Sequence, residues 1–203
     1  MRDRNIVGTF YIPTGNFPAY SQNNRISASE LLQMQSDGNE IGSHSVNHLD
    51  FTMLTETQIH QEFSDSKATL QSYGLTINNF AYPFGTGDYS YANTIASQYY
   101  RSTRIVFYSP MTIANTAFQL SAVDGESQGS EYVTLLPRLK SFVDFTVNNN
   151  HWTVFYFHNV VGYNDAVSYG GISAEDFASF LDYANASGAQ ILTVNQALNL
   201  GMT

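Results

Sequence analysis

The sequence predicts an α/β protein whose parallel strands and helices form a (β/α) barrel, complete or incomplete. Short apolar runs alternate with amphipathic segments of helical period along almost the whole chain, and this order favours parallel strands joined by crossover helices. The 203 residues, 43% of them hydrophobic, suit one domain with a substantial core. The sequence contains no evident linker, internal repeat or low-complexity tract. We therefore expect a single domain over residues 1–203.

The predicted strands are short, and several end in turn residues or polar side chains. They cover residues 6–12, 40–43, 79–82, 102–107, 118–123, 152–158 and 190–193. Pro83 follows the third of these runs and ends it, because proline cannot donate to a sheet ladder. The run from Trp152 to His158 is almost continuously apolar, which is typical of a strand covered on both faces.

The predicted helices begin at clear capping sequences. Ser27 and Thr55 are each followed three residues later by Glu30 or Gln58, the spacing of a capping box. The helices are expected over residues 27–34, 55–70, 89–99, 131–148 and 173–186. Pro137 lies inside the fourth span, so that the regular helix either begins there or kinks.

Composition limits the classes of partner. A net charge of −9 argues against nucleic acid or an anionic membrane surface. No apolar run approaches the ~18 residues that span a bilayer, so membrane insertion is not expected. The absence of cysteine excludes thiolate ligands, thiol nucleophiles and disulfides. Low lysine content and a polar, weakly charged composition favour an exported protein.

Aromatic residues are abundant, with 14 tyrosines and 14 phenylalanines. Tyrosine rings stack on sugars, but they also pack in protein cores, and the sequence leaves both roles open. The tyrosines concerned stand in predicted loops or at helix ends: Tyr89, Tyr91, Tyr99, Tyr100, Tyr163 and Tyr169.

His44 and His48 directly follow the predicted strand at residues 40–43. Two imidazoles four residues apart, on one turn of helix or a tight helical loop, point to the same place and form half of a metal site. The same spacing also occurs as a polar surface feature. Asp50 is a conceivable substitute ligand, but helical geometry would point it away from the pair.

Three polar or special segments follow predicted strands: the histidine pair, residues 82–85 and His158. Barrels place their chemistry at the carboxyl ends of strands, so these segments are expected to converge on one face. His158 could equally be a satisfied core histidine. The remaining candidates are given no catalytic role, because they read as structural, exposed, loop or turn residues: His60, His151, Asp88 and Asp124.

The motifs in this order resemble those of the NodB-homology polysaccharide deacetylases, carbohydrate esterase family four. They are His-Ser-Val-Asn-His at 44–48, Phe-Ala-Tyr-Pro-Phe-Gly at 80–85 and Phe-Tyr-Phe-His at 155–158, with similar flanking segments at 5–12, 38–44, 172–177 and 188–193. The resemblance implies a deformed (β/α) barrel and one divalent metal, usually zinc but sometimes cobalt or nickel. It also implies hydrolysis of N- or O-acetyl groups on a sugar polymer.

The resemblance also implies residue roles. His44 and His48 match the metal-binding histidines, and His158 matches the histidine that protonates the leaving amine or alkoxide. Phe84 stands where the family uses a backbone N–H as oxyanion donor. Tyr82 and Pro83 would form one wall of the substrate groove, while Tyr156 replaces a leucine at the acetyl-methyl pocket.

The departures from the family pattern concern the catalytic base. The family begins with a strand ending in two aspartates, one the general base and the other the third metal ligand, and this sequence has no counterpart. We therefore expect an N-terminally truncated domain that lacks its first strand. Ala81 stands where an arginine usually positions the base, and Asp124 lies in the region of the aspartate that tunes the acid histidine, without the usual neighbouring tryptophan.

The leading hypothesis is a metal-dependent deacetylase of an acetylated polysaccharide or oligosaccharide, outside the cell or associated with the cell wall. Chitin, peptidoglycan, xylan and exopolysaccharides are the candidate polymers. The alternative is a catalytically impaired, carbohydrate-binding relic of the same barrel. A third hypothesis is a non-hydrolytic metal-binding domain, in which two histidines alone would leave zinc under-coordinated.

Overall fold

The computed structural model describes residues 1–15, 26–85, 90–106 and 117–201. The chain divides into two compact units. The N-terminal unit consists mainly of Val7–Ile105, joined by residues 117–120 and by the chain from Leu192 onward. The C-terminal unit consists mainly of Met1–Ile6 and Ser121–Ile191. Each unit has its own buried core and is described by itself.

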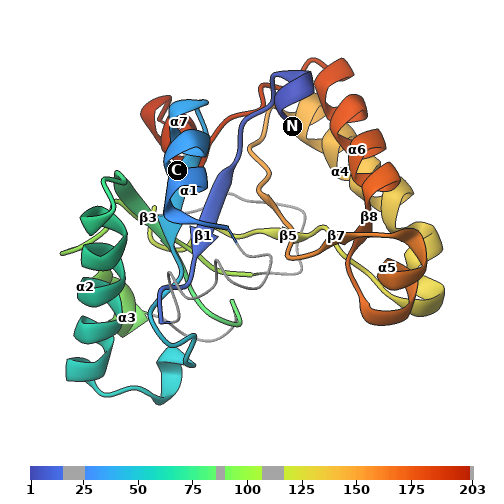
Figure 1. Cartoon of the computed structure of the whole chain (residues 1–203). Coiled ribbons are helices and arrows are strands. Elements are labelled where there is room, and N and C mark those ends of the chain that lie inside the picture. Colours follow the sequence, from blue (N-terminus) through green and yellow to red (C-terminus); the bar gives the residue numbers. More distant parts are fainter. Residues whose placement is uncertain (16–25, 86–89, 107–116, 202–203) are drawn as a thin grey trace. The chain divides into compact units, whose positions relative to one another are not determined.

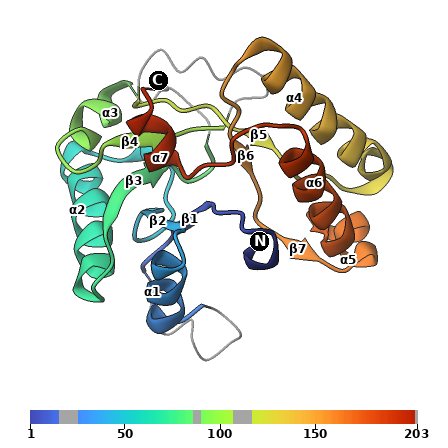
Figure 2. The same ribbon diagram turned by 90° about the horizontal axis from the view of Figure 1, so that it is seen from above.

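The N-terminal unit is built on a parallel sheet of four strands in the order β1-β2-β3-β4, which are all labelled in Figure 2 and of which Figure 1 labels β1 and β3. The strands are β1 (Thr9–Ile12), β2 (Glu40–Ser43), β3 (Ile77–Ala81) and β4 (Ser102–Arg104). The helices of this unit are α1 (Ala28–Ser36), α2 (Glu56–Ser72), α3 (Ser90–Ala96) and α7 (Val194–Asn199). A short 3₁₀ helix, η3 (Phe51–Met53), precedes α2. Sequential strands pair as neighbours because α1 and α2 provide the crossovers between them.

The predicted capping boxes are confirmed. The Ser27 and Thr55 side chains accept from the backbone N–H groups of Glu30 and Gln58, and both capping boxes are complete. Helix α2 then buries an apolar stripe against the sheet. Its Phe63 ring lies 4.8 Å from that of Phe80 on β3, centroid to centroid. This aromatic core fixes the helix on one face of the sheet.

The other face of the sheet carries a polar layer at the amino ends of the strands. The Glu40 carboxylate accepts from the Thr9 hydroxyl at 3.0 Å, from the backbone N–H of Asn195 at 2.8 Å, and from the Asn79 amide. Asn195 lies in the first turn of α7, so Glu40 ties this helix to the sheet. Thr193 caps the same helix. The predicted strand over 190–193 is wrong, because the segment leads directly into α7.

The C-terminal unit contains two short parallel strand pairs and three helices (Figure 2). The pairs are β5 (Val123–Asp124) with β6 (Phe155–Tyr156), and β7 (Val160–Val161) with β8 (Ile172–Ser173). The helices are α4 (Leu135–Asn149), α5 (Tyr163–Tyr169) and α6 (Ala174–Ala186), with α4 and α6 packed side by side. Two 3₁₀ helices complete the unit, η1 (Arg2–Arg4) and η4 (Gly129–Thr134). Arg4 ties η1 to α6 through two contacts with Asp182, at 2.6 and 2.8 Å.

Two further strand predictions are corrected. The apolar run 152–158 forms a strand only at Phe155–Tyr156, and both residues remain partly exposed, so the run is not a strand covered on both faces. Residues 118–123 contribute only a bridge at Leu120 and the start of β5. The helix predicted over 131–148 begins regularly at Leu135, with Pro137 in its first turn, where its missing N–H costs no hydrogen bond.

Parallel strands alternating with helices confirm the predicted α/β class. None of the described helices combines the length and apolar character that a membrane crossing requires. The expectation of one domain over residues 1–203 stays a prediction.

Gly42 provides a test of how closely β1 and β2 pack before the histidine pair. A Cβ atom at this position would lie 2.6 Å from the Tyr11 ring and 3.0 Å from the Asn79 backbone oxygen. We expect Gly42→Ala to lower the free energy of unfolding by about 1–3 kcal/mol, because the strands must shift to admit it. Chemical denaturation measures this change. Ser36→Ala, at an exposed position, is the control, and equal stability of the two variants would contradict the close packing.

Candidate functional site

The histidine pair lies in a loop that leaves the carboxyl end of β2. The backbone N–H of His44 still donates to the Ile12 carbonyl at 3.0 Å, so the first histidine is fixed by the sheet. The prediction of a helical turn is wrong, because Ser45 and His48 have φ values of 67° and 53°, in the left-handed region. The loop nevertheless brings the imidazole rings of His44 and His48 together, with centroids 4.9 Å apart and planes at 79°.

A backbone carbonyl orients the first imidazole. Nδ1 of His44 lies 2.7 Å from the carbonyl oxygen of Ala81, at the end of β3. Because a carbonyl only accepts, Nδ1 carries the hydrogen and Nε2 carries the lone pair. Metal-ligating histidines characteristically donate their other ring N–H in this way, which fixes both tautomer and orientation. Ala81, which replaces the family's arginine, thus contributes to the candidate site through its backbone.

A tight turn after β3 places Phe84 beside the histidine pair. The N–H of Gly85 donates to the Tyr82 carbonyl at 3.2 Å, and Phe84 takes a left-handed φ of 60°. The residue is 61% exposed, and its ring centroid lies 4.9 Å from that of His48. A left-handed aromatic residue is strained, at an order of magnitude of 1–3 kcal/mol.

The same turn corrects one expectation about the groove. Tyr82 is 1% exposed and packs among the core aromatics of the N-terminal unit, with its hydroxyl donating to Asn93 at 2.9 Å. Pro83 is buried as well. Strand alternation turns Tyr82 towards helix α2, so its ring does not form the wall that the resemblance implied. The exposed aromatic surface at this turn is Phe84.

His158 follows β6 in the C-terminal unit and contacts a carboxylate. Its Nδ1 lies 2.9 Å from Glu126 Oε2, and its backbone N–H donates to Glu126 Oε1 at 2.6 Å. The backbone N–H of Asn159 donates to the same oxygen. The imidazole itself is 62% exposed, so it faces solvent rather than a core. The half-buried Tyr156 ring lies 5.3 Å from it.

Glu126 is a site residue that the sequence did not reveal. The resemblance places Asp124 in the region of the aspartate that tunes the acid histidine. Asp124 instead uses Oδ1 to accept the backbone N–H of Glu126 at 2.9 Å and thereby shapes the turn after β5. Gly125 allows that turn, because a Cβ there would lie 2.1 Å from the Phe157 ring. A second acidic residue two positions beyond Asp124 was the available signal.

Burial would raise the pKa of the Glu126 carboxyl, but its hydrogen bonds outweigh that effect. The His158 ring and the backbone N–H groups of Asn159 and His158 all favour the ionised form, and the charge of a protonated His158 adds to them. The net result is a pKa below the ordinary value. Glu126 is therefore an ionised carboxylate at neutral pH that fixes the orientation of His158.

The donor set for a metal consists of two histidines. Among the described residues, no group of three or more histidine, aspartate or glutamate side chains is placed to hold an ion. Asp50 instead caps η3, accepting from the backbone N–H and hydroxyl of Thr52 at 2.9 and 2.7 Å, and these bonds lower its pKa. The imidazole pair fits a divalent first-row metal in its donor chemistry, as part of a ligand set.

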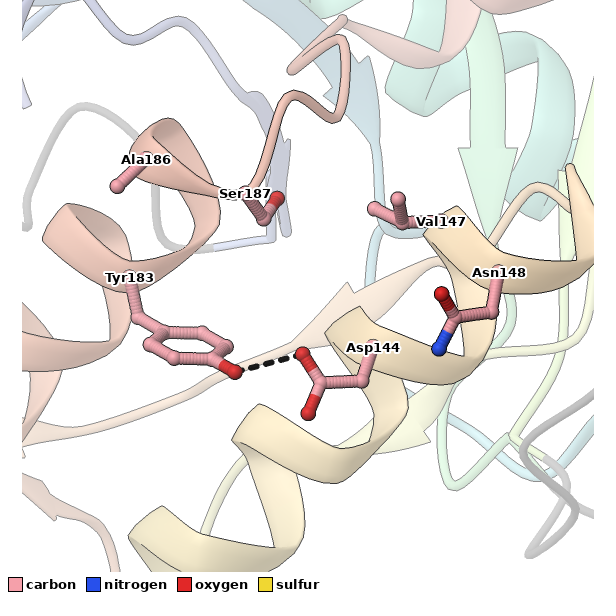
Figure 3. Close-up of a pocket in the computed structure, with 6 residues that line it drawn as sticks. All are labelled: Asp144, Val147, Asn148, Tyr183, Ala186 and Ser187. Carbon is pink, nitrogen blue, oxygen red and sulfur yellow. Dashed lines mark hydrogen bonds between the residues drawn. The ribbon is translucent and has the colours of Figure 1, made fainter.

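One hollow lies elsewhere, on the α4 and α6 surface of the C-terminal unit (Figure 3). It encloses about 330 Å³, and the Tyr183 hydroxyl at its edge donates to Asp144 at 2.6 Å. The lining residues are Asp144, Val147, Asn148, Tyr183, Ala186 and Ser187. None of the residues expected to act in catalysis lines this hollow.

The parallel α/β fold, the histidine pair after β2 and the carboxylate-bound histidine after β6 agree with the family that the sequence motifs resemble. A family model described as polysaccharide deacetylase matches residues 1–103, half of the 203-residue chain. The chain therefore belongs to the polysaccharide deacetylase family, as the sequence motifs predicted.

Solved structures of this family share the fold. One of them is peptidoglycan deacetylase PdaC from Bacillus subtilis, with 17% identity and a TM-score of 0.56. The match covers 98% of this chain and 80% of the PdaC chain. A family 4 carbohydrate esterase from Streptomyces lividans matches 92% over 76%, with 15% identity and a TM-score of 0.55. A mutant CE4 family pseudoenzyme with restored activity matches 97% over 59%, with 12% identity and a TM-score of 0.61. At these identities the likeness shows the fold, which confirms the predicted deformed barrel type.

A curated relative shares part of the sequence. A gellan lyase from a Bacillus species is 28% identical over 134 residues, which are 61% of this chain. The match spans only 5% of that protein's length.

The depressed pKa of Glu126 predicts a pH-dependent contribution to stability. Folding favours the ionised form of Glu126. Its contribution to the free energy of unfolding is therefore complete above the ordinary carboxyl pKa of 4.5, and it disappears as the pH falls through the lower pKa of Glu126 in the folded protein. We expect Glu126→Gln to lower the free energy of unfolding at pH 7 by about 1–3 kcal/mol, with the difference from wild type shrinking in acid. Denaturant titrations from pH 7 to strongly acidic pH measure it.

Glu131→Gln, which removes an exposed carboxylate of the same unit, is the matched control. A Glu126→Gln difference that persisted unchanged in acid would contradict the assignment.

Proposed function

We propose that this chain hydrolyses N- or O-acetyl groups of a polysaccharide with the help of a divalent metal held by His44 and His48. Zinc is the first candidate, with cobalt and nickel as alternatives. The single observation that carries the proposal is the His44–Ala81 hydrogen bond, which leaves the lone pair of His44 on Nε2 in a ring whose centroid lies 4.9 Å from that of His48. A metal bound there would polarise the acetyl carbonyl and lower the pKa of a bound water.

His158 supplies the proton that the leaving group needs. When protonated, the imidazole donates from Nδ1 to the Glu126 carboxylate and retains a second N–H at Nε2. Breaking the acetyl C–N or C–O bond leaves an amine or alkoxide, which takes the Nε2 proton. Glu126 orients the ring and stabilises its charged form, the role that the family gives to an aspartate.

Phe84 and Tyr156 are the proposed substrate contacts. The strained Phe84 holds its ring exposed beside His48, where the apolar face of a sugar or an acetyl methyl group can pack. Its backbone N–H is the proposed oxyanion donor. Tyr156, half buried beside His158, stands at the proposed acetyl pocket. Chitin, peptidoglycan, xylan and exopolysaccharides are the proposed polymers, and an extracellular or cell-wall location stays a prediction.

The general base and third metal ligand have no counterpart among the residues assigned here. The family supplies both from a pair of aspartates ahead of the motifs found in this chain. Two imidazoles alone leave a zinc ion under-coordinated, and so weaker binding than at a complete three-ligand site is expected.

The proposed reaction predicts metal-dependent acetate release. We expect acetate from at least one polymer in a panel of acetylated chitin oligomers, peptidoglycan, xylan and gellan, with zinc or cobalt added. Gellan is included because a relative is named for it. His44→Ala should reduce the rate by at least ~100-fold, since it removes half of the metal ligands.

His151→Ala is the matched control, because this histidine stacks on Phe145 within the C-terminal unit and is not a proposed ligand. Acetate release that is equally fast in His44→Ala and wild type would overturn the metal role of His44. Silence of the wild-type chain on every polymer would overturn the proposed activity.

The second candidate is a carbohydrate-binding protein without catalysis. Two findings favour it: no three-ligand cluster occurs in the described part of the chain, and a structural relative is named a pseudoenzyme. This function predicts saturable glycan binding that survives chelation of metal and is reduced by Phe84→Ala. Isothermal titration with a chelator present measures it, and metal-dependent turnover would exclude it.

A further inference from the structure

The loop that carries the histidine pair is held by one turn of helix α2. Glu62 and Ser66 lie four residues apart and therefore share a face of that helix. The Ser43 hydroxyl, immediately before His44, donates to Ser66 at 2.8 Å. This contact fixes the end of β2 where the first histidine leaves the sheet.

Glu62 holds the segment between the two histidines. Its Oε2 accepts the backbone N–H groups of Val46 and Asn47 at 2.8 and 2.9 Å. Its Oε1 accepts the Asn47 side-chain amide at 2.7 Å. Both carboxylate oxygens are therefore used by the two residues that precede His48.

Burial makes the Glu62 carboxylate depend on these hydrogen bonds. Glu62 is only 5% exposed, and a buried carboxylate is costly unless hydrogen bonds compensate for its lost hydration. The N–H groups of Val46 and Asn47 supply that compensation and are themselves satisfied by it. Any other loop conformation would leave the carboxylate, the amides or both without these partners.

The loop needs such support because its backbone is strained. Ser45 and His48, at each end of the segment that Glu62 holds, have left-handed φ values of 67° and 53°. L-residues without a compensating contact avoid this region. The Ser45 hydroxyl helps by accepting the His48 N–H at 3.0 Å, and the Ser45 and Val46 carbonyls accept from the backbone N–H groups of Thr14 and Gly15. The Val46 and Asn47 N–H groups depend on Glu62.

We propose that Glu62 is a positioning residue for the metal site, which sets the spacing of His44 and His48 by fixing the loop between them. It acts through Val46 and Asn47 and holds no metal itself. The inference rests on the proposed metal role of the histidine pair. It adds a residue outside the motifs, on a helix rather than at a strand end, to the set that determines metal affinity.

The test is Glu62→Gln, which keeps the shape but replaces one acceptor oxygen by an NH₂ group and removes the charge that strengthens the bonds from the Val46 and Asn47 N–H groups. We expect zinc affinity, measured by competition with a chromophoric chelator, to fall by about 10-fold or more. In metal-free protein, hydrogen exchange at the Val46 and Asn47 amides should accelerate, while exchange along β3 stays unchanged. Asp65→Asn, an exposed carboxylate of the same helix, is the matched control.

A compensating change separates positioning from general destabilisation. Asn47→Asp alone sets two carboxylates against each other and should also weaken zinc binding. Combined with Glu62→Gln, it gives the new NH₂ group a carboxylate acceptor, so the double variant should recover zinc affinity and amide protection.

Wild-type affinity and exchange in Glu62→Gln would overturn the proposal, as would a folded double variant that shows no recovery. If the wild-type chain binds no zinc, the proposed function fails, and the exchange measurement alone decides whether Glu62 fixes the loop.

Discussion

The position of β2 between β1 and β3 is the constraint on which the candidate metal site depends. Parallel pairing sets Ile12 on β1 opposite Ser43 on β2, and it sets Phe80, near the end of β3, opposite the same Ser43. His44 therefore leaves the sheet with its backbone bonded to one neighbour and its ring bonded to the other. Neither contact requires a side chain from the neighbouring strand, because a backbone carbonyl provides each acceptor.

Each candidate histidine group in this chain is organised by a carboxylate from another element. Glu62 on α2 accepts two backbone N–H groups from the His44–His48 loop, and Glu126 after β5 accepts two from the residues at His158 and Asn159. In both cases the carboxylate binds the backbone that carries the imidazole. Ionised acceptors form stronger hydrogen bonds than neutral ones, and they are strongest where water is excluded. Only 12% of the residues are charged. Glu62 and Glu126 are among them, and each stands where a neutral acceptor would hold its loop less firmly.

Local signals in the sequence were sufficient for much of the fold but not for the loops of the site. Capping boxes at Ser27 and Thr55 and the alternation of strands and helices predicted the main elements, because each depends on neighbours in sequence. The loop at 44–48 is not the helical turn that the histidine spacing predicts, since left-handed φ values at Ser45 and His48 arise from long-range contacts with α2 and the sheet. Tyr82 was assigned to a groove because a motif does not show which face of a strand its aromatic ring takes.

The missed carboxylates differ in how visible they were. Glu62 occupies a position in the buried stripe of α2 that also contains Ile59, Phe63 and Ser66, and a charged residue inside an apolar stripe is a recognisable signal of a buried contact. Glu126 stands in an irregular segment after a two-residue strand, where no periodicity distinguishes inward from outward positions. Its role depends on a turn that the Asp124 side chain shapes and that the close approach of Phe157 to Gly125 requires.

Backbone strain is concentrated where the proposed chemistry is. Five non-glycine residues in the described part of the chain have positive φ, and two of them, Asn5 and Asn150, end helices, where asparagine is well tolerated. The other three are Ser45, His48 and Phe84. All three lie around the imidazole pair. Serine and phenylalanine do not prefer this conformation, although histidine adopts it more often than most residues. A sequence selected only for stability would place glycine or asparagine there. The strain is maintained by the sheet and by α2, and it places one imidazole and one exposed aromatic ring side by side. That arrangement is useful for binding a ligand and has no evident value for folding.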